Sequence, residues 1–324
     1  MNLTEINEKV LNGIRLSRDE GLFLLGIPLS ELRDSATKIT KYFFHDKVEL
    51  CCISAGKCGK CSEDCKFCAQ SSHYETKIEI SKLKTAEEFF AEAKYNSDRG
   101  VHRFSIVTSG VRLSKHEVRE VAKAYKLISE NLPIKCCGSL GLLDYEDFLL
   151  LAQNGLSRIH DNLETSRRYF PQICTTHTFD DKVRSLLFAK KAGLSLCSGC
   201  IIGMGEEEYD RIDLALSLAE IGVDSVPINI LNPIKGTPLE NRPHLSEEEI
   251  KRCIAIFRHI LPKAVLRLAG GRTLIRKFYS ELYDFGINAE ITGDMLTTSG
   301  FSIENDVSNI IAAKRIVGII DEQH

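Results

Sequence analysis

Residues 48–72 read VELCCISAGKCGKCSEDCKFCAQSS, a short and mostly apolar run followed by a loop that is rich in cysteine. The run Val48–Ile53 predicts a buried β-strand, since it is short, rich in apolar residues and followed by a glycine-containing loop. The loop then spaces Cys61, Cys65 and Cys68 as CxxxCxxC. Three thiolates at this spacing can hold three irons of a cubane iron–sulfur cluster, which leaves the fourth iron open to another ligand.

A structural zinc site is the alternative for this loop. Cys58 and Cys61 form a CxxC pair, so that Cys58, Cys61, Cys65 and Cys68 could together bind one zinc ion. The spacing differs, however, from the paired CxxC motifs of zinc ribbons and from the four-cysteine runs of bacterial ferredoxins.

Along the rest of the chain, short apolar runs alternate with longer amphipathic segments. The strand candidates are Val48–Ile53, Phe104–Thr108, Ile134–Gly138, Arg158–His160, Leu194–Ile202, Ser225–Ile230, Ala264–Leu268 and Asn288–Ile291. The helix candidates are Thr85–Arg99, Lys115–Asn131, Tyr145–Asn154, Asp180–Ala192, Glu207–Glu220, Ser246–Ile260 and Thr273–Asp284. Eight strands that alternate with helices predict an α/β protein with a (β/α)8 barrel of the TIM type. An open, doubly wound sheet is the alternative.

Residues 1–45 predict a helical N-terminal extension, because apolar residues such as Leu11 and Ile14 fall at helical spacing before Pro28. The barrel domain is then expected to cover residues 46–324. The chain begins without a charged segment followed by an apolar run, and its longest apolar stretches are too short to span a membrane. Its net charge of −3 is spread along the sequence, so no nucleic-acid partner is expected. We therefore expect a soluble, cytoplasmic protein.

The chain contains 12 cysteines, which in a reducing compartment favour metal or redox chemistry over structural disulfides. Cys174 and Cys253 stand alone in the sequence and are predicted to be small residues of the hydrophobic core. Glu290, on the last strand candidate, is expected on the outer face of the sheet, toward solvent or a helix.

Neighbouring residues of a strand point to opposite faces of the sheet. Only one residue of the pair Cys51–Cys52, and one of the pair Cys136–Cys137, should therefore face the interior of the barrel. An inward Cys197 likewise sends Cys200 outward, unless Gly199 bends the strand.

The CxxxCxxC loop with an aromatic residue before its last cysteine resembles the signature of the radical S-adenosylmethionine (SAM) enzymes. Further segments resemble biotin synthases in their order and spacing. They are CSEDCKFCAQSS (61–72), ICTTHTF (173–179), CSGCIIGMGE (197–206), DSVPINILNPIKGTPLEN (224–241) and RLAGGR (267–272). This resemblance covers nearly the whole chain after the N-terminal helices.

In radical SAM enzymes a 4Fe–4S cluster binds the amino and carboxylate groups of SAM and cleaves it to methionine and a 5′-deoxyadenosyl radical. The resemblance implies a sulfurtransferase that removes hydrogen from C9 and C6 of dethiobiotin, with one SAM for each, and inserts sulfur to give biotin. It also implies a flavodoxin or ferredoxin as electron donor and a homodimer. The first alternative is another radical SAM enzyme of the same subgroup, of the hydrogenase-maturation or methylornithine-synthase kind. The second is a non-enzymatic scaffold that binds zinc or a cluster.

The resemblance also implies which residues contact the two small molecules. The SAM contacts are Phe67, Glu164, Lys182, Gly199, Ile201 and Gly203, and the substrate contacts are His160, Asn162 and Asn229. Glu164 stands where the family more usually has Asp, and Lys182 where an Arg commonly pairs with the SAM carboxylate. His160 stands where an Asn is expected. An Asn amide can both donate and accept hydrogen bonds, as the cyclic urea of dethiobiotin requires.

Biotin synthases resemble one another in a second, auxiliary iron–sulfur cluster that supplies the inserted sulfur, in its familiar form a 2Fe–2S cluster held by three Cys and one Arg. Cys137, Cys197 and Arg267 match three of these four ligands, but Ser105 occupies the position of the third cysteine. Serine is a poor replacement for a soft thiolate on iron. Cys51, on the neighbouring strand candidate, is the predicted replacement. Three cysteines would suit a 4Fe–4S type of cluster with an extra sulfide.

Overall fold

The computed structural model describes residues 1–293 and 301–320, and its parallel strands form a closed barrel. The strands are β1 (Lys47–Lys57), β2 (Arg103–Thr108), β3 (Lys135–Ser139), β4 (Leu156–His160), β5 (Ser195–Cys197), β6 (Cys200–Ile202), β7 (Ser225–Ile230), β8 (Val265–Leu268), β9 (Ala289–Thr292) and β10 (Ile316–Val317). They pair in the order β1-β2-β3-β4-β5-β7-β8-β9, and β9 pairs with β1 to close the ring. β6 follows β5 and pairs with β7, and β10 pairs with the start of β1. The predicted (β/α)8 barrel is confirmed.

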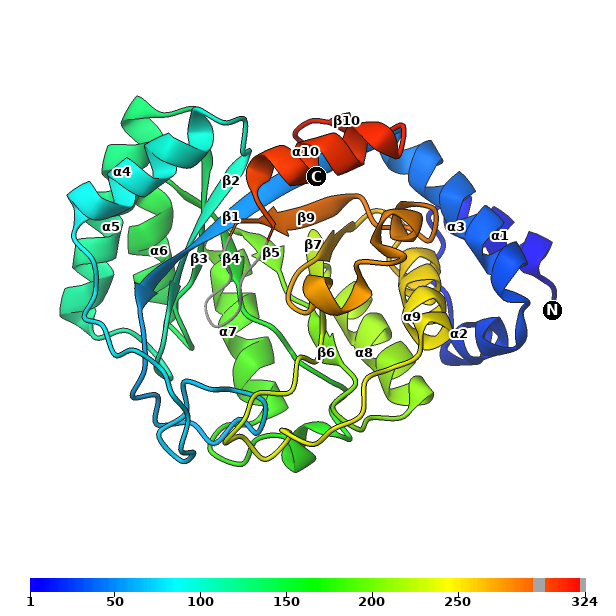
Figure 1. Cartoon of the computed structure of the whole chain (residues 1–324), viewed down its shortest axis with the longest axis horizontal. Helices are drawn as coiled ribbons and strands as arrows, with labels where there is room; N and C mark the ends of the chain where they lie inside the picture. The colour runs from blue at the N-terminus through cyan, green and yellow to red at the C-terminus, as the bar shows by residue number, and fades with distance from the viewer. Residues whose placement is uncertain (294–300, 321–324) are drawn as a thin grey trace.

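Helices cover the outside of this barrel (Figure 1). They are α1 (Leu3–Leu11), α2 (Arg18–Phe23), α3 (Leu29–Phe44), α4 (Ala86–Ser97), α5 (Lys115–Asn131), α6 (Tyr145–Gln153), α7 (Phe179–Lys191), α8 (Glu208–Ile221), α9 (Glu247–Ile260) and α10 (Ile303–Ala312). Helices α4, α5, α7 and α9 begin with capping boxes, in which a Ser or Thr side chain and an acidic side chain three residues later satisfy each other's backbone N–H. These caps set where the helices that follow the strands begin.

The N-terminal helices α1 to α3 lie beyond α9, at one end of the molecule (Figure 1). Helix α3 packs along α9, where Ser35 Oγ lies 2.7 Å from His259 Nε2. Leu24, Leu32 and Ile39 are buried in the same hydrophobic core as the barrel helices. The helices predicted for the first 45 residues are therefore present, and they share their core with the barrel.

The predicted strand Leu194–Ile202 is broken into β5 and β6 at Gly199. The N–H of Gly199 donates to Asn162 Oδ1 at 2.9 Å, and a Cβ at this position would lie 1.9 Å from the carbonyl oxygen of Pro227. The chain thus approaches β7 so closely that regular pairing is interrupted.

The predicted helix Thr273–Asp284 is instead two short 3₁₀ helices, η3 (Arg272–Ile275) and η4 (Tyr279–Tyr283). Arg272 donates to Asp306 of α10, and Tyr279 donates to Glu290 of β9. These contacts with distant elements hold the segment in tighter turns than its apolar periodicity indicates.

The hydrophobic core lies between the strands and the surrounding helices. Outward strand residues such as Phe104, Ile159 and Leu196 are fully or almost fully buried there. The inward positions of the same strands are mostly polar, among them Arg103 and Arg158, which line a central cavity. This reversal, with apolar residues outside the ring and polar ones inside, places the functional groups within the barrel.

Candidate functional site

A cavity of about 320 Å³ runs from the cysteine loop into the barrel. Its volume lies at the lower end of the range usual for small-molecule sites. Of the predicted site residues, its walls contain Cys51, Phe67, Cys68, Cys137, His160, Asn162, Glu164, Cys197, Ile201, Asn229 and Arg267. Cys61, Cys65, Lys182, Gly199 and Gly203 do not line it. The strands thus bring most of the predicted site together.

One side of the cavity is formed by buried charges around Glu49. Oε1 of this carboxylate lies 2.5 Å from a guanidinium nitrogen of Arg267, 3.0 Å from Arg103 Nε and 3.8 Å from a guanidinium nitrogen of Arg158. Burial would raise the pKa of Glu49, but the three guanidinium groups outweigh it and lower the pKa to about 2. Three positive charges against one negative charge make this part of the barrel interior electropositive.

Three thiols face this electropositive region. Cys51, Cys137 and Cys197 line the cavity. Their neighbours Cys52, Cys136 and Cys200 are buried instead in the core between the strands and the helices. The expected alternation along the strands is confirmed. Ser105 sits between Ile53 of β1 and Cys137 of β3 in the strand register, so Cys51 does lie on the strand next to it.

Cys197 is the most acidic of the three thiols. Burial alone would raise its pKa, but His160, Arg158 and Arg267 lower the pKa to about 7. Its register partner across β4 and β5 is His160. Burial outweighs Arg267 at Cys51 and raises the pKa of that thiol to about 12. Near neutral pH, Cys197 is therefore the thiol best prepared to act as a thiolate ligand.

Two asparagines in the cavity wall are held by backbone groups. Asn162 Oδ1 accepts the N–H of Gly199, and Asn229 Oδ1 accepts the N–H of Gly270 at 2.8 Å. Asn229 Nδ2 donates to the carbonyl of Cys200 at 2.9 Å. Asn162 Nδ2 donates to Glu164 Oε2 at 3.3 Å, so each amide is fixed in orientation and its Nδ2 still has one further N–H to offer.

Glu164 adopts a left-handed backbone conformation, with φ of 67°, and it lies in the cavity wall. Its backbone bridges to β6, since its N–H donates to Gly199 O and its carbonyl accepts the N–H of Ile201. Burial raises the pKa of Glu164 to about 7, despite the opposing effect of Lys182 and His160. The carboxyl group is therefore poised to change charge near neutral pH.

Lys182 is buried and is not a solvated helix residue. Its Nζ donates to Asp161 Oδ1 at 2.7 Å. Burial would lower the pKa of Lys182, but Asp161 and Glu164 raise it. Asp161 Oδ2 is buried and has no hydrogen-bond partner among the described residues.

The two glycines predicted to contact SAM allow close backbone packing and a turn in this structure. Gly199 packs against Pro227, as described above. Gly203 has a φ of 97°, and its N–H donates to Glu206 Oε1 at 2.8 Å. Contact with SAM stays a prediction for both residues, whereas Ile201 lies in the cavity wall itself.

The cysteine loop lies at one end of the cavity, where Cys68 and Phe67 line the wall. Burial raises the pKa of Cys68 to about 11. Cys58 is held in a backbone bridge with Ser81. Within residues 1–293 and 301–320, the thiols of the proposed four-cysteine zinc site do not form a close group of ligand atoms.

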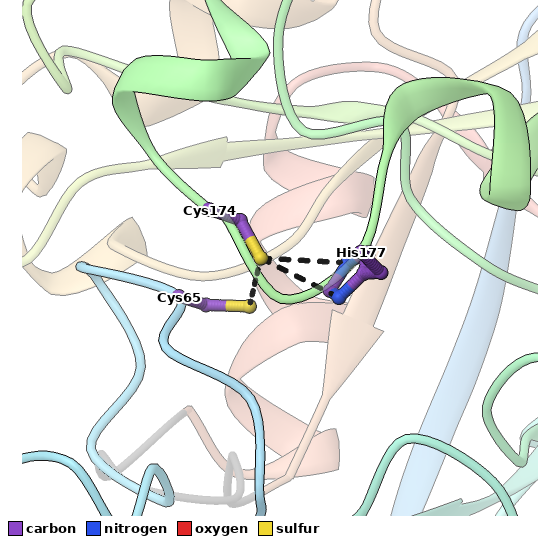
Figure 2. A group of neighbouring side chains, drawn as sticks. All are labelled: Cys65, Cys174 and His177. Atoms are coloured by element: carbon purple, nitrogen blue, oxygen red, sulfur yellow. Dashed lines mark hydrogen bonds between the residues drawn. The ribbon is translucent and has the colours of Figure 1, made fainter.

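Cys174 is a residue of the hydrophobic core, as predicted, but it also contacts the cysteine loop. Its Sγ lies 3.7 Å from Cys65 Sγ and 3.4 Å from His177 Nδ1 (Figure 2). The contact was hidden because the two cysteines are separated by more than a hundred residues; the proximity of His177 in ICTTHTF was the available signal. Cys253 is a core residue, as predicted.

Several buried charges were not identified from the sequence, namely Glu49, Arg103, Arg158 and Asp161.

Glu290 faces the helical layer, as expected. It is fully buried there and bound by Arg272 at 2.8 Å, by Tyr279 at 2.8 Å and by Tyr283. Glu290 therefore anchors the segment after β8 rather than lining the cavity.

Two family models match the chain. The radical SAM superfamily matches residues 57–219, and the biotin and thiamin synthesis associated domain matches residues 227–314. A biotin synthase of Clostridium botulinum (strain Hall) is 47% identical over 309 residues, which are 95% of this chain and 97% of that relative. Biotin synthase 2 of Corynebacterium diphtheriae is 48% identical over 94% of this chain and 92% of its own length.

Two solved structures share the barrel. Methylornithine synthase superposes with a TM-score of 0.82 at 20% identity and covers 97% of both chains. The hydrogenase maturase HydG superposes with a TM-score of 0.83 at 18% identity and covers 98% of this chain and 75% of its own. These two alternatives thus share the fold, whereas sequence identity over almost the full length is found with biotin synthases. The chain therefore belongs to the biotin synthase family of radical SAM enzymes.

Proposed function

We propose that this chain converts dethiobiotin to biotin by inserting sulfur between C9 and C6. The observation that carries the proposal is the single cavity that joins the cysteine loop to three inward thiols. Cys68 lies in the wall at the loop, and Cys51, Cys137 and Cys197 line the barrel interior. A substrate between these two groups would be close both to the site of radical formation and to the source of sulfur.

Cys61, Cys65 and Cys68 would hold the 4Fe–4S cluster, since three thiols on one loop match its ligand requirement and leave an open position. When bound, this cluster and SAM supply the electron and the hydrogen-abstracting radical. Lys182 and Glu164 would bind SAM, because Lys182 is a buried cation close enough to Cys65 to interact with it and Glu164 lines the cavity.

Asn162 and Asn229 would orient the ureido ring of dethiobiotin. Both line the cavity, and both amides are already fixed by backbone hydrogen bonds. A pre-oriented amide loses little freedom on binding, so the reacting carbons are presented in one pose. His160 would contact the substrate less directly, since it also holds Cys197 in a thiolate-favouring environment.

Cys51, Cys137 and Cys197 would hold the auxiliary cluster, with Arg267 beside them. The guanidinium groups around Glu49 would stabilise the negative charge of thiolates and sulfides. Three cysteines suit a 4Fe–4S type of cluster with an extra sulfide better than a 2Fe–2S cluster. Iron and sulfide analysis with Mössbauer spectra would decide, and a clean 2Fe–2S signal would contradict the larger cluster.

An anaerobic assay with dethiobiotin, SAM and a reductant tests the function. We expect biotin, with two molecules of 5′-deoxyadenosine formed per biotin as two hydrogen abstractions require. The matched control is Cys61→Ala, which should form neither product. If the wild-type chain cleaves SAM but makes no biotin, the proposed reaction is wrong and another radical SAM activity of this barrel replaces it.

The electron donor would be a flavodoxin or a ferredoxin, and the proposed assembly is a homodimer in the cytoplasm. None of the helices in the described residues is long and apolar enough to cross a membrane. Light scattering of the purified chain would measure its mass in solution, and a monomer would contradict the proposed dimer.

A further inference from the structure

Cys65, Cys174 and His177 come together at the mouth of the barrel from two separate segments (Figure 2). Cys65 Sγ and Cys174 Sγ are 3.7 Å apart, and Cys174 Sγ lies 3.8 Å from His177 Nε2. One ligand atom from each residue can be chosen so that all three lie within 4.8 Å of one another. They form a compact set of two soft sulfur donors and one imidazole.

These separations match the edges of a tetrahedral metal site. With metal–sulfur bonds of about 2.3 Å and a metal–nitrogen bond of about 2.0 Å, two sulfurs lie about 3.8 Å apart and a sulfur and a nitrogen about 3.5 Å apart. The two measured edges are within a few tenths of an ångström of these values. The third edge, from Cys65 Sγ to a ring nitrogen of His177, is no longer than 4.8 Å, so the imidazole would move toward Cys65 by at most about 1.3 Å to complete the site.

The histidine is already oriented for such a role. Its Nδ1 lies 2.6 Å from Glu63 Oε2, and both side chains are about nine-tenths buried. A carboxylate on one ring nitrogen of a histidine fixes the tautomer and leaves the other nitrogen, here Nε2, as the metal ligand. Ser62 Oγ in turn donates to Glu63 Oε1 at 2.9 Å. The support expected around a metal-binding histidine is therefore present.

The two segments are held together by contacts that need no metal. The N–H of Lys66 donates to Ile173 O at 3.0 Å. Asp64 Oδ1 accepts the N–H of Thr175 at 2.8 Å and that of Thr176 at 3.2 Å. These bonds flank the pair Cys65–Cys174 on both sides. A preformed site costs little conformational entropy on binding.

We propose that, before its 4Fe–4S cluster is loaded, the chain binds one thiophilic divalent cation, such as ferrous iron or zinc, through Cys65, Cys174 and His177. Tetrahedral sites with sulfur and imidazole ligands suit both ions, and the fourth position stays open. Because Cys65 is also assigned to the cluster, the single ion and the cluster exclude each other. The binding of the ion by these three residues does not depend on the reaction proposed above. Only the mutual exclusion of ion and cluster rests on the assignment of Cys65 to the 4Fe–4S cluster.

Cobalt(II) titration of the cluster-free, reduced, chelator-treated full chain tests the ligand set, because tetrahedral cobalt–thiolate complexes are coloured. One equivalent should give the tetrahedral spectrum, and zinc should displace it. Cys174→Ser should remove one of the two thiolates, and His177→Gln should weaken binding at least about tenfold. Cys61→Ser and Cys68→Ser are the matched controls in the same loop and should leave the spectrum unchanged.

The proposal is wrong if Cys61→Ser or Cys68→Ser abolishes the cobalt spectrum while Cys174→Ser and His177→Gln both leave it intact. Circular dichroism of each variant shows whether it is folded.

A second experiment tests whether the single ion and the cluster exclude each other. Zinc-loaded wild type should take up the cluster more slowly than the chelator-treated protein, as followed by absorbance, and Cys174→Ser should lose this difference. Equal rates with and without zinc would disprove the exclusion. A chain that binds cobalt as expected but makes no biotin would disprove the proposed function alone.

Discussion

Cys197 and His160 show how two neighbouring side chains set each other's charge inside the barrel. Burial opposes the thiolate, but His160 and two arginines lower the pKa of Cys197 to about 7. Replacing His160 with Asn removes a positive partner, so His160→Asn should raise the pKa of Cys197 well above 7. Alkylation of the cluster-free protein as a function of pH, read by mass spectrometry at Cys197, measures this. An unchanged profile would mean that the arginines alone lower the pKa.

Glu164 links the cavity to the stability of the cluster-free chain. Its pKa is raised to about 7 in the folded protein, so the folded state holds the proton more tightly than the unfolded state. The stabilising contribution of this group is present below its unfolded pKa and is lost as pH rises through about 7. Glu164→Gln should therefore stabilise the chain by about 2–3 kcal/mol near pH 8, and by little near pH 5.

Urea unfolding at both pH values measures the effect of Glu164→Gln. The exposed Glu220 of α8 supplies the control, since Glu220→Gln should change stability little at either pH. A loss of stability in Glu164→Gln at high pH would show that the ionised carboxylate is needed for folding.

Single positions along a strand could be assigned from the sequence because alternation is a local rule. This rule correctly predicted that one cysteine of each pair faces the cavity, namely Cys51 and Cys137, and that Cys52 and Cys136 face the helical layer. It gave no indication that Cys174 would meet Cys65, because that contact depends on how two distant loops are placed. Glu49, Arg103 and Arg158 were missed for the same reason, since they lie on three different strands.

At the scale of elements, the break between β5 and β6 is set by the close approach of Gly199 to β7. A Cβ there would lie 1.9 Å from the backbone oxygen of Pro227, which cannot rotate away as a side chain would. Gly199→Ala should therefore destabilise the chain by about 3 kcal/mol or more. Gly26→Ala is the matched control, because no atom lies within 4 Å of a Cβ at Gly26. Similar melting temperatures for the two variants would contradict the close packing of β6 on β7.

The order of helices and strands was predictable because each βα unit carries its own apolar periodicity and its own helix cap. The prediction was wrong for Thr273–Asp284, where an apolar pattern indicated a helix. Arg272, Tyr279 and Tyr283 instead bind Glu290, which joins this segment to β9. The apolar pattern of one segment contains no information on an ion pair with another segment. The 3₁₀ turns could therefore be recognised only from the structure.

In the whole molecule, the closed ring turns polar residues of its strands inward, where Arg103, Arg158 and Arg267 are almost fully buried. The electropositive region around Glu49, the inward thiols and the fixed amides therefore act in one low-dielectric space, where charges interact more strongly than at a surface. A cluster with anionic ligands is expected to be stabilised there. The cysteine loop follows the end of β1, whereas these thiols lie within β1, β3 and β5, although one cavity reaches both.

This separation allows the two clusters to be tested independently. Cys51→Ser should remove the auxiliary-cluster signal in Mössbauer spectra and abolish biotin formation, because serine is a poor ligand for iron. The signal of the cluster held by Cys61, Cys65 and Cys68, and SAM cleavage, should remain. Cys52→Ser is the matched control on the same strand, since Cys52 points into the helical layer and should retain both clusters. If Cys51→Ser keeps its full iron content and both signals, Cys51 is a packing residue and Cys137 and Cys197 must have another partner.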